Sequence, residues 1–313
     1  MKDTEKNRLY DMVILGGGPA GFTAALYAAR AGLSAVVLEQ LSPGGQMALS
    51  HKIDNYPGFE DGIDGFALAE KMEAQALRFG AVTELAQVQS ADLASSPKII
   101  HTSEGAFYGK TVVIATGAVP KTLGLPEEQA LAGRGVHYCA ACDGMFYRDK
   151  TVVVVGGGNS AAMDALLLSR VAKKVTLVHR RDTLRAEKVY ASQLKNGKNV
   201  EFRWNSELTS LLHEDRLTGV RIRNNKTGLV EEIPCDGVFI SVGRRPATKL
   251  LEGQLELDSS GYILADESTV TAIPGVYAAG DARTKPMRQI VTAVADGAVA
   301  VHMAEKFLSD REG

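Results

Sequence analysis

A glycine-rich turn occurs twice in this chain, each time between an apolar segment and an alanine-rich helical pattern. The first copy is Gly16-Gly17-Gly18-Pro19-Ala20-Gly21, which follows the apolar run Met12–Leu15. The second is Gly156-Gly157-Gly158-Asn159-Ser160-Ala161, which follows Val152–Val155. Backbone amides at such a strand-to-helix turn can meet the pyrophosphate of a dinucleotide. One copy alone can arise from packing, but two copies in the same context predict two dinucleotide sites.

The two copies differ at the residue that ends the next predicted strand. Glu39 follows Val36–Leu38, whereas His179-Arg180-Arg181 follows Val175–Val178, with Arg185 close behind. An acidic side chain there accepts hydrogen bonds from ribose hydroxyls, while clustered guanidinium groups suit a 2′-phosphate. We therefore predict two different dinucleotides, the second being an NADP. His179 has two interpretations: it donates to the same phosphate, or it closes the strand.

Length and composition are those of a globular protein with two domains. The chain has 313 residues, of which 45% are hydrophobic and 23% charged. Its formal net charge of -2 gives no indication of a nucleic-acid partner. The polar segment Met1–Tyr10 is not typical of a signal peptide, and Asp296 interrupts the apolar stretch Ile290–Val301. We expect a cytoplasmic protein without a membrane span.

The order of the segments predicts one domain inserted into another. Residues 11–40 open the first nucleotide domain, and Lys110–Ala115 is a further strand of it. The apolar strand within Pro274–Asp281 has no glycine-rich unit of its own and is expected to return to that domain. The predicted fold is α/β, with two Rossmann-like three-layer dinucleotide-binding domains. The outer domain comprises 1–118 and 247–313, and the inserted domain comprises 119–246.

The cysteines indicate the chemistry. Cys139-Ala140-Ala141-Cys142 is followed directly by Asp143, and a CxxC beside βαβ patterns is typical of a redox dithiol. Two alternatives are half of a zinc site, for which His137 is the nearby further ligand, and a buried inert pair. Cys235 stands alone on a predicted strand and is interpreted as a core residue.

A dithiol and an NADP site in one chain require an intermediary. Nicotinamide delivers two electrons as hydride, whereas a disulfide accepts them through thiolate chemistry, so a flavin is the natural link. The first nucleotide site, with Glu39, is the place for FAD. Because the nicotinamide and the dithiol lie on the same inserted domain, both must reach one flavin in turn. The links Gly117–Lys121 and Gly243–Ala247 combine glycine with proline, which favours a rotation of the inserted domain.

Several motifs together resemble the low-molecular-weight, bacterial-type thioredoxin reductases. They are Gly16–Gly21, Pro43–Gln46 with Asn55–Gly58, CAACDG, GGGNSA, HRRDTLRAEK and GDARTKPMRQIVTAVADGA. The resemblance covers nearly the whole chain in order. It implies FAD in the outer domain, NADPH in the inserted domain, a homodimer and a thioredoxin-like partner. Ala141 departs from the family's usual Thr, Met163-Asp164 from an acidic pair, and Ser241–Pro246 is unusually basic.

The fingerprints and the resemblance together assign the cofactor residues. Those predicted for FAD are Gly16, Gly18, Pro19, Ala20, Gly21, Glu39, Gln40, Gly45, Gln46, Asn55, Ala115, Thr116, Gly117, Gly280, Asp281, Arg288, Gln289 and Ile290. Those predicted for NADPH are Gly156, Gly158, Asn159, Ser160, Ala161, His179, Arg180, Arg181 and Arg185. Asp281 has the alternative of a turn or helix-cap residue, and Arg288 that of a solvated helix charge.

The resemblance also implies roles at the dithiol. Cys142 faces the flavin, Cys139 exchanges with the partner, and Asp143 is the acid, with helix capping as its alternative. Arg134, Met145 and Phe146 are candidates for partner docking, whereas packing is at least as good an account of Tyr147. The expected function is NADPH-dependent thioredoxin-disulfide reduction. Alternatives are a reductase of another redoxin or a peroxiredoxin, a ferredoxin-linked variant, which HRRDTLRA disfavours, and a flavin-binding redox sensor.

Overall fold

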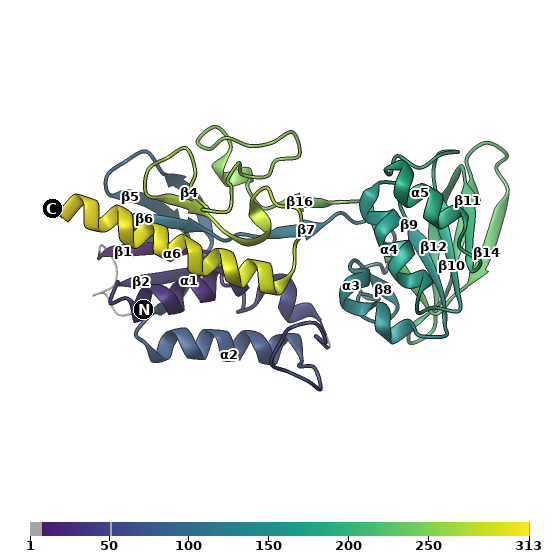
Figure 1. Cartoon of the computed structure of the whole chain (residues 1–313), viewed down its shortest axis with the longest axis horizontal. Coiled ribbons are helices and arrows are strands. Elements are labelled where there is room, and N and C mark those ends of the chain that lie inside the picture. The colour runs from purple at the N-terminus through teal and green to yellow at the C-terminus, as the bar shows by residue number, and fades with distance from the viewer. Residues whose placement is uncertain (1–7, 51, 313) are drawn as a thin grey trace. The chain divides into compact units, whose positions relative to one another are not determined.

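The chain folds into two units, each built around a parallel sheet. The computed structural model describes residues 8–50 and 52–312, so the segment 1–7, which bears on the signal-peptide expectation, lies outside them. One unit comprises Met1–Val119 and Arg245–Gly313, and the other comprises Pro120–Arg244 (Figure 1). Among the described residues, no helix has both the length and the apolar character needed to cross a membrane.

The first unit contains a sheet whose parallel part has the order β3-β2-β1-β6-β17. Its strands are β1 (Leu9–Leu15), β2 (Ala35–Glu39), β3 (Val82–Leu85), β6 (Gly105–Ile114) and β17 (Val276–Ala278). The first half of β6 also pairs antiparallel with β5 (Lys98–Thr102), which pairs with β4 (Val88–Asp92). Strand β17 comes from the part of the chain that follows the second unit, so the sheet is completed across the interruption.

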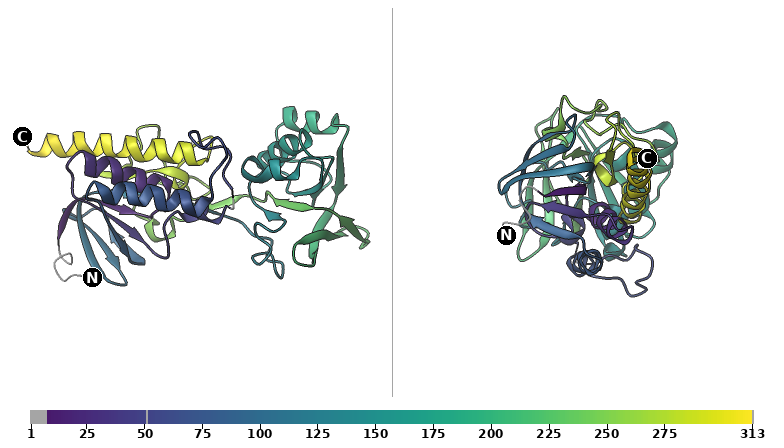
Figure 2. Two further views of the ribbon diagram at one scale, coloured as in Figure 1. Left: turned by 90° about the horizontal axis from the view of Figure 1, so that it is seen from below. Right: turned by 90° about the vertical axis from the view of Figure 1, so that its left-hand side faces the viewer.

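Three helices cover one face of this sheet: α1 (Pro19–Arg30), α2 (Gly65–Arg78) and α6 (Ile290–Glu312) (Figure 2). Alternate residues of β1 point to opposite faces. Met12 and Ile14 join the helical core, whereas Val13 and Leu15 join a second core with Leu251 on the other face. Helices α1 and α6 approach closely, because a Cβ on Gly297 would lie 2.3 Å from the Ala20 carbonyl oxygen.

Short elements complete the first unit and the two links. These are the 3-10 helices η1 (Gly45–Leu49), η3 (Lys249–Leu251) and η4 (Gly280–Ala282), and the strands β7 (Ala118–Pro120) and β16 (Arg244–Pro246). The two links pair as a small sheet, β16 with β7. On either side of it, the Lys121 amide donates to the Gly243 carbonyl and the Ala247 amide to the Gly117 carbonyl.

The second unit has a parallel sheet with the order β11-β10-β9-β15-β8. The strands are β8 (Val136–His137), β9 (Thr151–Val155), β10 (Lys174–His179), β11 (Val200–Trp204) and β15 (Gly237–Ile240). Its helices are α3 (Ala140–Asp143), η2 (Gly144–Tyr147), α4 (Asn159–Ser169) and α5 (Lys188–Lys195). An antiparallel sheet of β12 (Ser206–His213), β13 (Leu217–Asn224) and β14 (Val230–Pro234) packs through Val220 and Ile222 into a core shared with Val153 and Val238.

Candidate active site and nucleotide-binding turns

The first glycine-rich turn joins β1 to α1, and its glycines are sterically required. Gly16 has φ +105°, and a Cβ there would lie 2.6 Å from the Ala115 carbonyl oxygen. A Cβ on Gly21 would lie 1.9 Å from the Gly16 carbonyl oxygen. Gly18 is the N-cap of α1, and no atom lies within 4 Å of where its Cβ would be. This open N-terminus, with Pro19 in the first turn, leaves room for a phosphate near the helix amides.

Glu39, at the end of β2, is tied to the same turn. Its Oε2 accepts from the Gly17 amide at 2.8 Å, and its Oε1 accepts from the amides of Gln40 and Leu41. The Gly44 amide donates to the Gly17 carbonyl at 2.7 Å, which brings the segment with Gly45 and the exposed Gln46 to the turn. The residues predicted for an adenosine ribose and for the neighbouring loop therefore lie together.

The carboxyl ends of β1, β6 and β17 meet at one edge of the sheet. The Ala115 amide donates to the Leu15 carbonyl, and the Ala279 amide donates to the Ile114 carbonyl, both at 2.9 Å. Thr116 and Gly117 therefore follow β6 next to the turn, and Gly280 follows β17. The Thr116 hydroxyl is buried and has no hydrogen-bond partner among the described residues. An unsatisfied hydroxyl beside an open glycine turn fits a bound polar group such as the FAD diphosphate.

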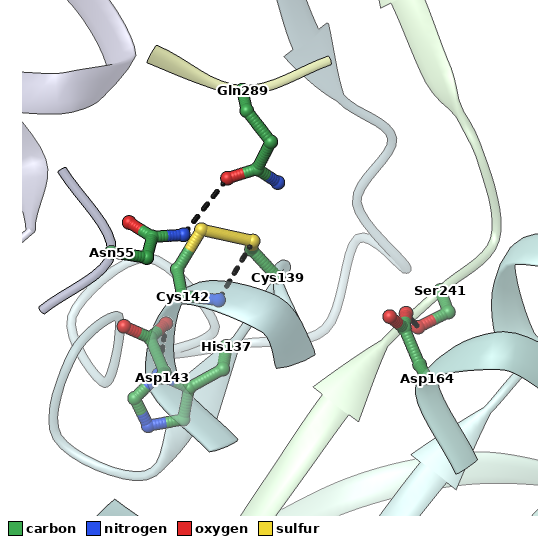
Figure 3. The surroundings of a disulfide bond; sticks show 8 residues. All are labelled: Asn55, His137, Cys139, Cys142, Asp143, Asp164, Ser241 and Gln289. Atoms are coloured by element: carbon green, nitrogen blue, oxygen red, sulfur yellow. Dashed lines mark hydrogen bonds and ion pairs between the residues drawn. A yellow bond between two sulfur atoms is a disulfide. The ribbon is translucent and has the colours of Figure 1, made fainter. Parts of the chain in front are cut away.

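Asn55, Arg288 and Gln289 come from two loops of the first unit. Asn55 Nδ2 donates to Gln289 Oε1 at 3.0 Å, as Figure 3 shows. Arg288 lies just before α6 and is half-buried, with its guanidinium 3.9 Å from the centre of the Tyr262 ring. Its Nη2 donates to the Arg283 carbonyl, while its Nε is buried without a partner. The alternative of a solvated helix charge does not describe this placement.

A buried ionic cluster next to Gly280 was not predicted from the sequence. Asp296 accepts from Arg283 Nε and Nη2 at 2.9 and 2.8 Å and from Lys285 Nζ at 2.7 Å. Burial favours a raised pKa of Asp296, but the hydrogen bonds from Arg283 and Lys285 outweigh it, so the pKa lies below its usual value. Asp296 Oδ2 also accepts from the Gly280 amide at 2.8 Å. The cluster therefore fixes the backbone at a predicted FAD residue.

The second glycine-rich turn joins β9 to α4 in the same way. A Cβ on Gly156 would lie 2.4 Å from the Ser241 carbonyl oxygen, and Gly158 is an N-cap with nothing near its Cβ position. His179 stands where Glu39 stands in the first unit, but its ring is buried directly beneath Gly157, 2.1 Å from where a Cβ on that glycine would lie. Burial and then Arg185 lower the pKa of His179. Its Nε2 has no hydrogen-bond partner.

The arginine-bearing loop is fastened to this turn. The Arg185 amide donates to the Gly157 carbonyl at 2.7 Å. Asn159 donates to the Glu187 carboxylate at 2.8 Å and accepts from the Glu187 amide at 2.9 Å. Arg180, Arg181 and Arg185 are all exposed. The loop thus carries three solvent-facing guanidinium groups next to the open N-terminus of α4, an arrangement that fits a nucleotide with an extra phosphate.

Cys139 and Cys142 form a disulfide with a Cα–Cα distance of 5.3 Å (Figure 3). Cys139 is the N-cap of α3, and the Cys142 amide donates to Cys139 Sγ at 3.2 Å. The zinc alternative has no support at His137, which is engaged by Asp143 and Tyr147. Cys235 is buried with a free thiol, but the predicted strand is wrong there: the residue lies between β14 and β15. Pro234 ends β14, and Asp236 then bonds to the Thr151 backbone.

Asp143 lies at the end of α3, next to Cys142. Its Oδ2 is 2.8 Å from His137 Nδ1, and His137 Nε2 is 2.6 Å from the Tyr147 hydroxyl. The N-cap of α3 is Cys139 and not Asp143, and Asp143 makes no side-chain capping bond at the start of η2 either, so the capping alternative is not what the structure shows. The His137 contact was missed, because the sequence singled out His137 only as a metal ligand.

The surface that follows the dithiol is partly apolar. Met145 and Phe146 on η2 are 51% and 38% exposed, whereas Tyr147 is only 2% exposed and packs inward. Arg134 is exposed, and its guanidinium donates to the Ala130 carbonyl. The two docking candidates on η2 therefore reach solvent, and Tyr147 belongs to the core.

A buried carboxyl connects the dithiol region with the second nucleotide turn. Asp164 on α4 accepts from the Ser241 hydroxyl at 2.5 Å (Figure 3). Burial raises the pKa of Asp164, against the effect of the Ser241 hydrogen bond and of Arg244. A hydrogen bond from the Ala140 backbone also lowers the pKa of Asp164. Met163 therefore replaces one residue of the family's acidic pair, while Asp164 remains. Asp164 links α4 to α3 through the Ala140 backbone.

Comparison with known proteins gives the same picture. A family model described as pyridine nucleotide-disulphide oxidoreductase matches residues 10–297. The chain is 43% identical to a thioredoxin reductase of Treponema pallidum, over 96% of this chain and 97% of the relative. It is 45% identical to a thioredoxin reductase of Streptomyces clavuligerus, over 96% and 94%. The crystal structure of thioredoxin reductase from Streptococcus pyogenes matches with a TM-score of 0.91, at 44% identity, covering 97% of this chain and 100% of that one.

The chain belongs to the pyridine nucleotide-disulphide oxidoreductases and, within them, to the thioredoxin reductase family. The predicted α/β class with two Rossmann-like domains is confirmed. FAD and NADPH are the cofactors of this family, which confirms that part of the sequence analysis. Which residues hold each cofactor stays a prediction, for which the open glycine turns, the unpaired Thr116 hydroxyl and the exposed arginines are the supporting observations.

Proposed function

We propose that the protein reduces the disulfide of thioredoxin or a thioredoxin-like protein with NADPH, through FAD and the Cys139–Cys142 pair. The observation that carries the proposal is the disulfide itself, which lies in the same unit as an open glycine turn flanked by three exposed arginines. The first unit, predicted from the sequence as 1–118 with 247–313, binds FAD, and the second unit, predicted as 119–246, binds NADPH. When bound, FAD supplies the two-electron link between nicotinamide and disulfide.

The residues at the dithiol have different roles in the thiol–disulfide exchange. Cys139 attacks the partner's disulfide, and the amide of Cys142 stabilises its sulfur by the hydrogen bond described above. Cys142 closes the intramolecular disulfide and faces the flavin in the other half of the cycle. Asp143 exchanges the proton of the thiol next to it. Cys139 caps α3, and Cys142 and Asp143 lie on it. The division of roles among them follows from the family resemblance.

A coupled assay tests the proposal directly. The protein with bound FAD should oxidise NADPH when a thioredoxin of the source organism is present in its disulfide form, and it should oxidise NADH much more slowly. Glutaredoxin-like and peroxiredoxin partners are assayed in parallel, and reduced ferredoxin is assayed as the electron donor in place of NADPH. Steady turnover with a protein disulfide would exclude a redox sensor without turnover, whereas activity with reduced ferredoxin but not with NADPH would contradict the proposal.

Two reactants must approach one flavin, and this requires motion between the units. The nicotinamide site and the dithiol belong to the second unit, and the flavin site belongs to the first. We infer one orientation that brings the dithiol to the flavin and another that brings the nicotinamide and frees Cys139. The paired links β7 and β16, with Gly117 at φ +71° and Gly243 at φ +108°, are the natural hinge.

The basic loop should determine the choice between NADPH and NADH. Arg180→Ala with Arg181→Ala is expected to raise the KM for NADPH about 100-fold, because each charge-assisted hydrogen bond to the 2′-phosphate contributes about 1.5 to 3 kcal/mol. The KM for NADH should change little, since NADH lacks this phosphate. Arg170→Ala, an exposed arginine at the end of α4, is the control. Equal losses for both nucleotides would indicate a role in folding instead.

The apolar side chains of η2 are expected to dock the partner. Phe146→Ala should raise the KM for the protein disulfide about tenfold, the effect of losing a moderate aromatic hot spot. Reduction of a small aromatic disulfide should be unchanged, because it needs only the dithiol. Leu229→Ala removes another exposed apolar side chain of this unit and serves as the control. A similar loss with both substrates would show that Phe146 only packs the helix.

Two further features belong to the proposal. We expect a homodimer, as the family resemblance implies, and sedimentation of the FAD-loaded protein measures it. We also expect a cytoplasmic protein, because a dithiol cycle driven by NADPH operates in a reducing compartment.

A further inference from the structure

His137, Tyr147 and Asp143 form a hydrogen-bonded chain that ends beside the disulfide. Asp143 Oδ2 lies 2.8 Å from His137 Nδ1, and the opposite ring nitrogen lies 2.6 Å from the Tyr147 hydroxyl. The imidazole is only 6% exposed and stacks on Phe239 with ring centres 5.2 Å apart. Figure 3 shows His137 and Asp143 beneath the disulfide. A buried polar ring held at both nitrogens has one fixed orientation.

The hydrogen bonds assign the ring nitrogens of His137. Burial raises the pKa of Tyr147 to about 12, so the phenol stays protonated throughout the neutral range. The Tyr147 hydroxyl therefore donates to Nε2, and Nδ1–H donates to the Asp143 carboxylate. Both buried ring nitrogens are hydrogen-bonded in this arrangement.

The charges around His137 come from several elements. Asp143 faces it from α3, and Tyr147 from η2, while Phe239 of β15 is uncharged. Arg216, before β13, and Asp236, before β15, act on Tyr147, and Lys150 lies 5.5 Å from the centre of the Tyr147 ring. Asp143 is thus the charged group in direct contact with the imidazole, and the more distant charges act through Tyr147.

We propose that His137 is a positioning residue for Asp143: it holds the carboxylate by Oδ2, which leaves Oδ1 to exchange the proton of Cys142. The inference rests on the proposed function, because it assigns Asp143 to the dithiol exchange. Its consequence is that closure of the Cys139–Cys142 disulfide depends on the hydrogen bond between His137 and Asp143.

Atoms and electrons balance in the exchange step. The Cys139 thiolate attacks one sulfur of the partner's disulfide, a Cys139–partner bond forms, and the other partner sulfur leaves as a thiolate that takes a proton from water. Cys142 then gives its proton to Asp143, and its thiolate attacks Cys139 Sγ. The Cys139–Cys142 bond forms and the second partner sulfur leaves as a thiolate, which takes the proton that Asp143 received from Cys142. The chain's two thiols are oxidised, and the partner's disulfide is reduced to two thiols.

A small aromatic disulfide, dithiobis(nitrobenzoate), separates the two steps without NADPH. Mixed with the reduced FAD-loaded protein in a stopped-flow instrument, it releases one coloured thiolate when Cys139 attacks and a second when Cys142 closes the disulfide. His137→Phe keeps an aromatic ring in the pocket but has no donor. It should slow the second release about tenfold at pH 7 and leave the first within about twofold, because the Asp143 carboxylate loses the hydrogen bond that holds it in position.

His137→Asn distinguishes positioning from packing. Its amide can donate to Asp143 but cannot take up a proton, so the second release should recover to within about threefold of the wild type. His213→Asn, an exposed histidine paired with Glu127, is the control and should change neither release.

The outcomes separate this proposal from the proposed function. An unchanged second release in His137→Phe, or a second release in His137→Asn as slow as in His137→Phe, would overturn the role of His137. Equal slowing of both releases in both variants would also overturn it, because that pattern indicates packing. If the wild type closes its disulfide normally but turns over no protein disulfide with NADPH, the proposed function fails while the role of His137 stands.

Discussion

Cys142→Ser is expected to retain FAD and to lose about 10⁴-fold or more of its NADPH-dependent disulfide reduction, the scale on which loss of a nucleophile acts. A serine cannot form or open the bond to Cys139, so the electrons have no route from the first unit to the partner. The Cys142 amide, which donates to Cys139 Sγ, belongs to the backbone and survives the substitution. Visible absorbance measures the bound flavin, and the coupled assay measures the loss.

The remaining thiol makes this result specific. In Cys142→Ser, Cys139 should still attack a small aromatic disulfide once and then remain trapped as the mixed disulfide, which mass spectrometry detects. Cys235→Ser is the matched control, because burial raises the pKa of that thiol to about 12 and it takes no part in exchange. Normal turnover in Cys142→Ser would show that the assignment of the dithiol is wrong.

The features that the sequence could predict are those with local causes. Gly21 is dictated by a contact within a single turn, because a Cβ there would lie 1.9 Å from the Gly16 carbonyl oxygen. The apolar runs before both glycine-rich turns have the composition of buried parallel strands. The CxxC spacing likewise brings two thiols together on one turn of helix, and the disulfide is present as expected. These patterns need no knowledge of distant contacts, and the fold class follows from their order.

The features that escaped prediction depend on tertiary packing. Asp296 appeared in the sequence only as a charge interrupting an apolar stretch, because its partner Arg283 lies on a separate segment before α6. His137 was considered only because it lies close to the cysteines in the sequence. Its hydrogen-bond partners, Asp143 and Tyr147, follow it at spacings that no helix or strand period explains. His179 was left with two interpretations, and its packing under Gly157 depends on how β10 lies beside β9.

Asp296→Ala is expected to destabilise the first unit by about 3 kcal/mol, the lower end of the cost of breaking a buried ion pair. The substitution leaves Arg283 and Lys285 in the core without their carboxylate. The cost stays at the lower end because Arg283 keeps two carbonyl acceptors and lies 3.6 Å from the exposed Glu267. Thermal unfolding measures the change, and Asp310→Ala, an exposed carboxylate on the same helix, is the control.

The same carboxylate links stability to pH and to the flavin. The pKa of Asp296 is lowered on folding. Its ionised carboxylate therefore contributes fully to the free energy of unfolding above the unfolded pKa of about 3.8, and this contribution is lost as the pH falls through the lower folded pKa. The free energy of unfolding of Asp296→Ala should therefore approach that of the wild type only in that acidic range.

Asp296→Ala should also release FAD more readily at neutral pH, because the Gly280 amide loses its acceptor. Asp296→Asn retains an acceptor for that amide but no charge, so FAD retention should recover more than thermal stability; parallel recovery of both would contradict the separate roles given to the charge and the hydrogen bond.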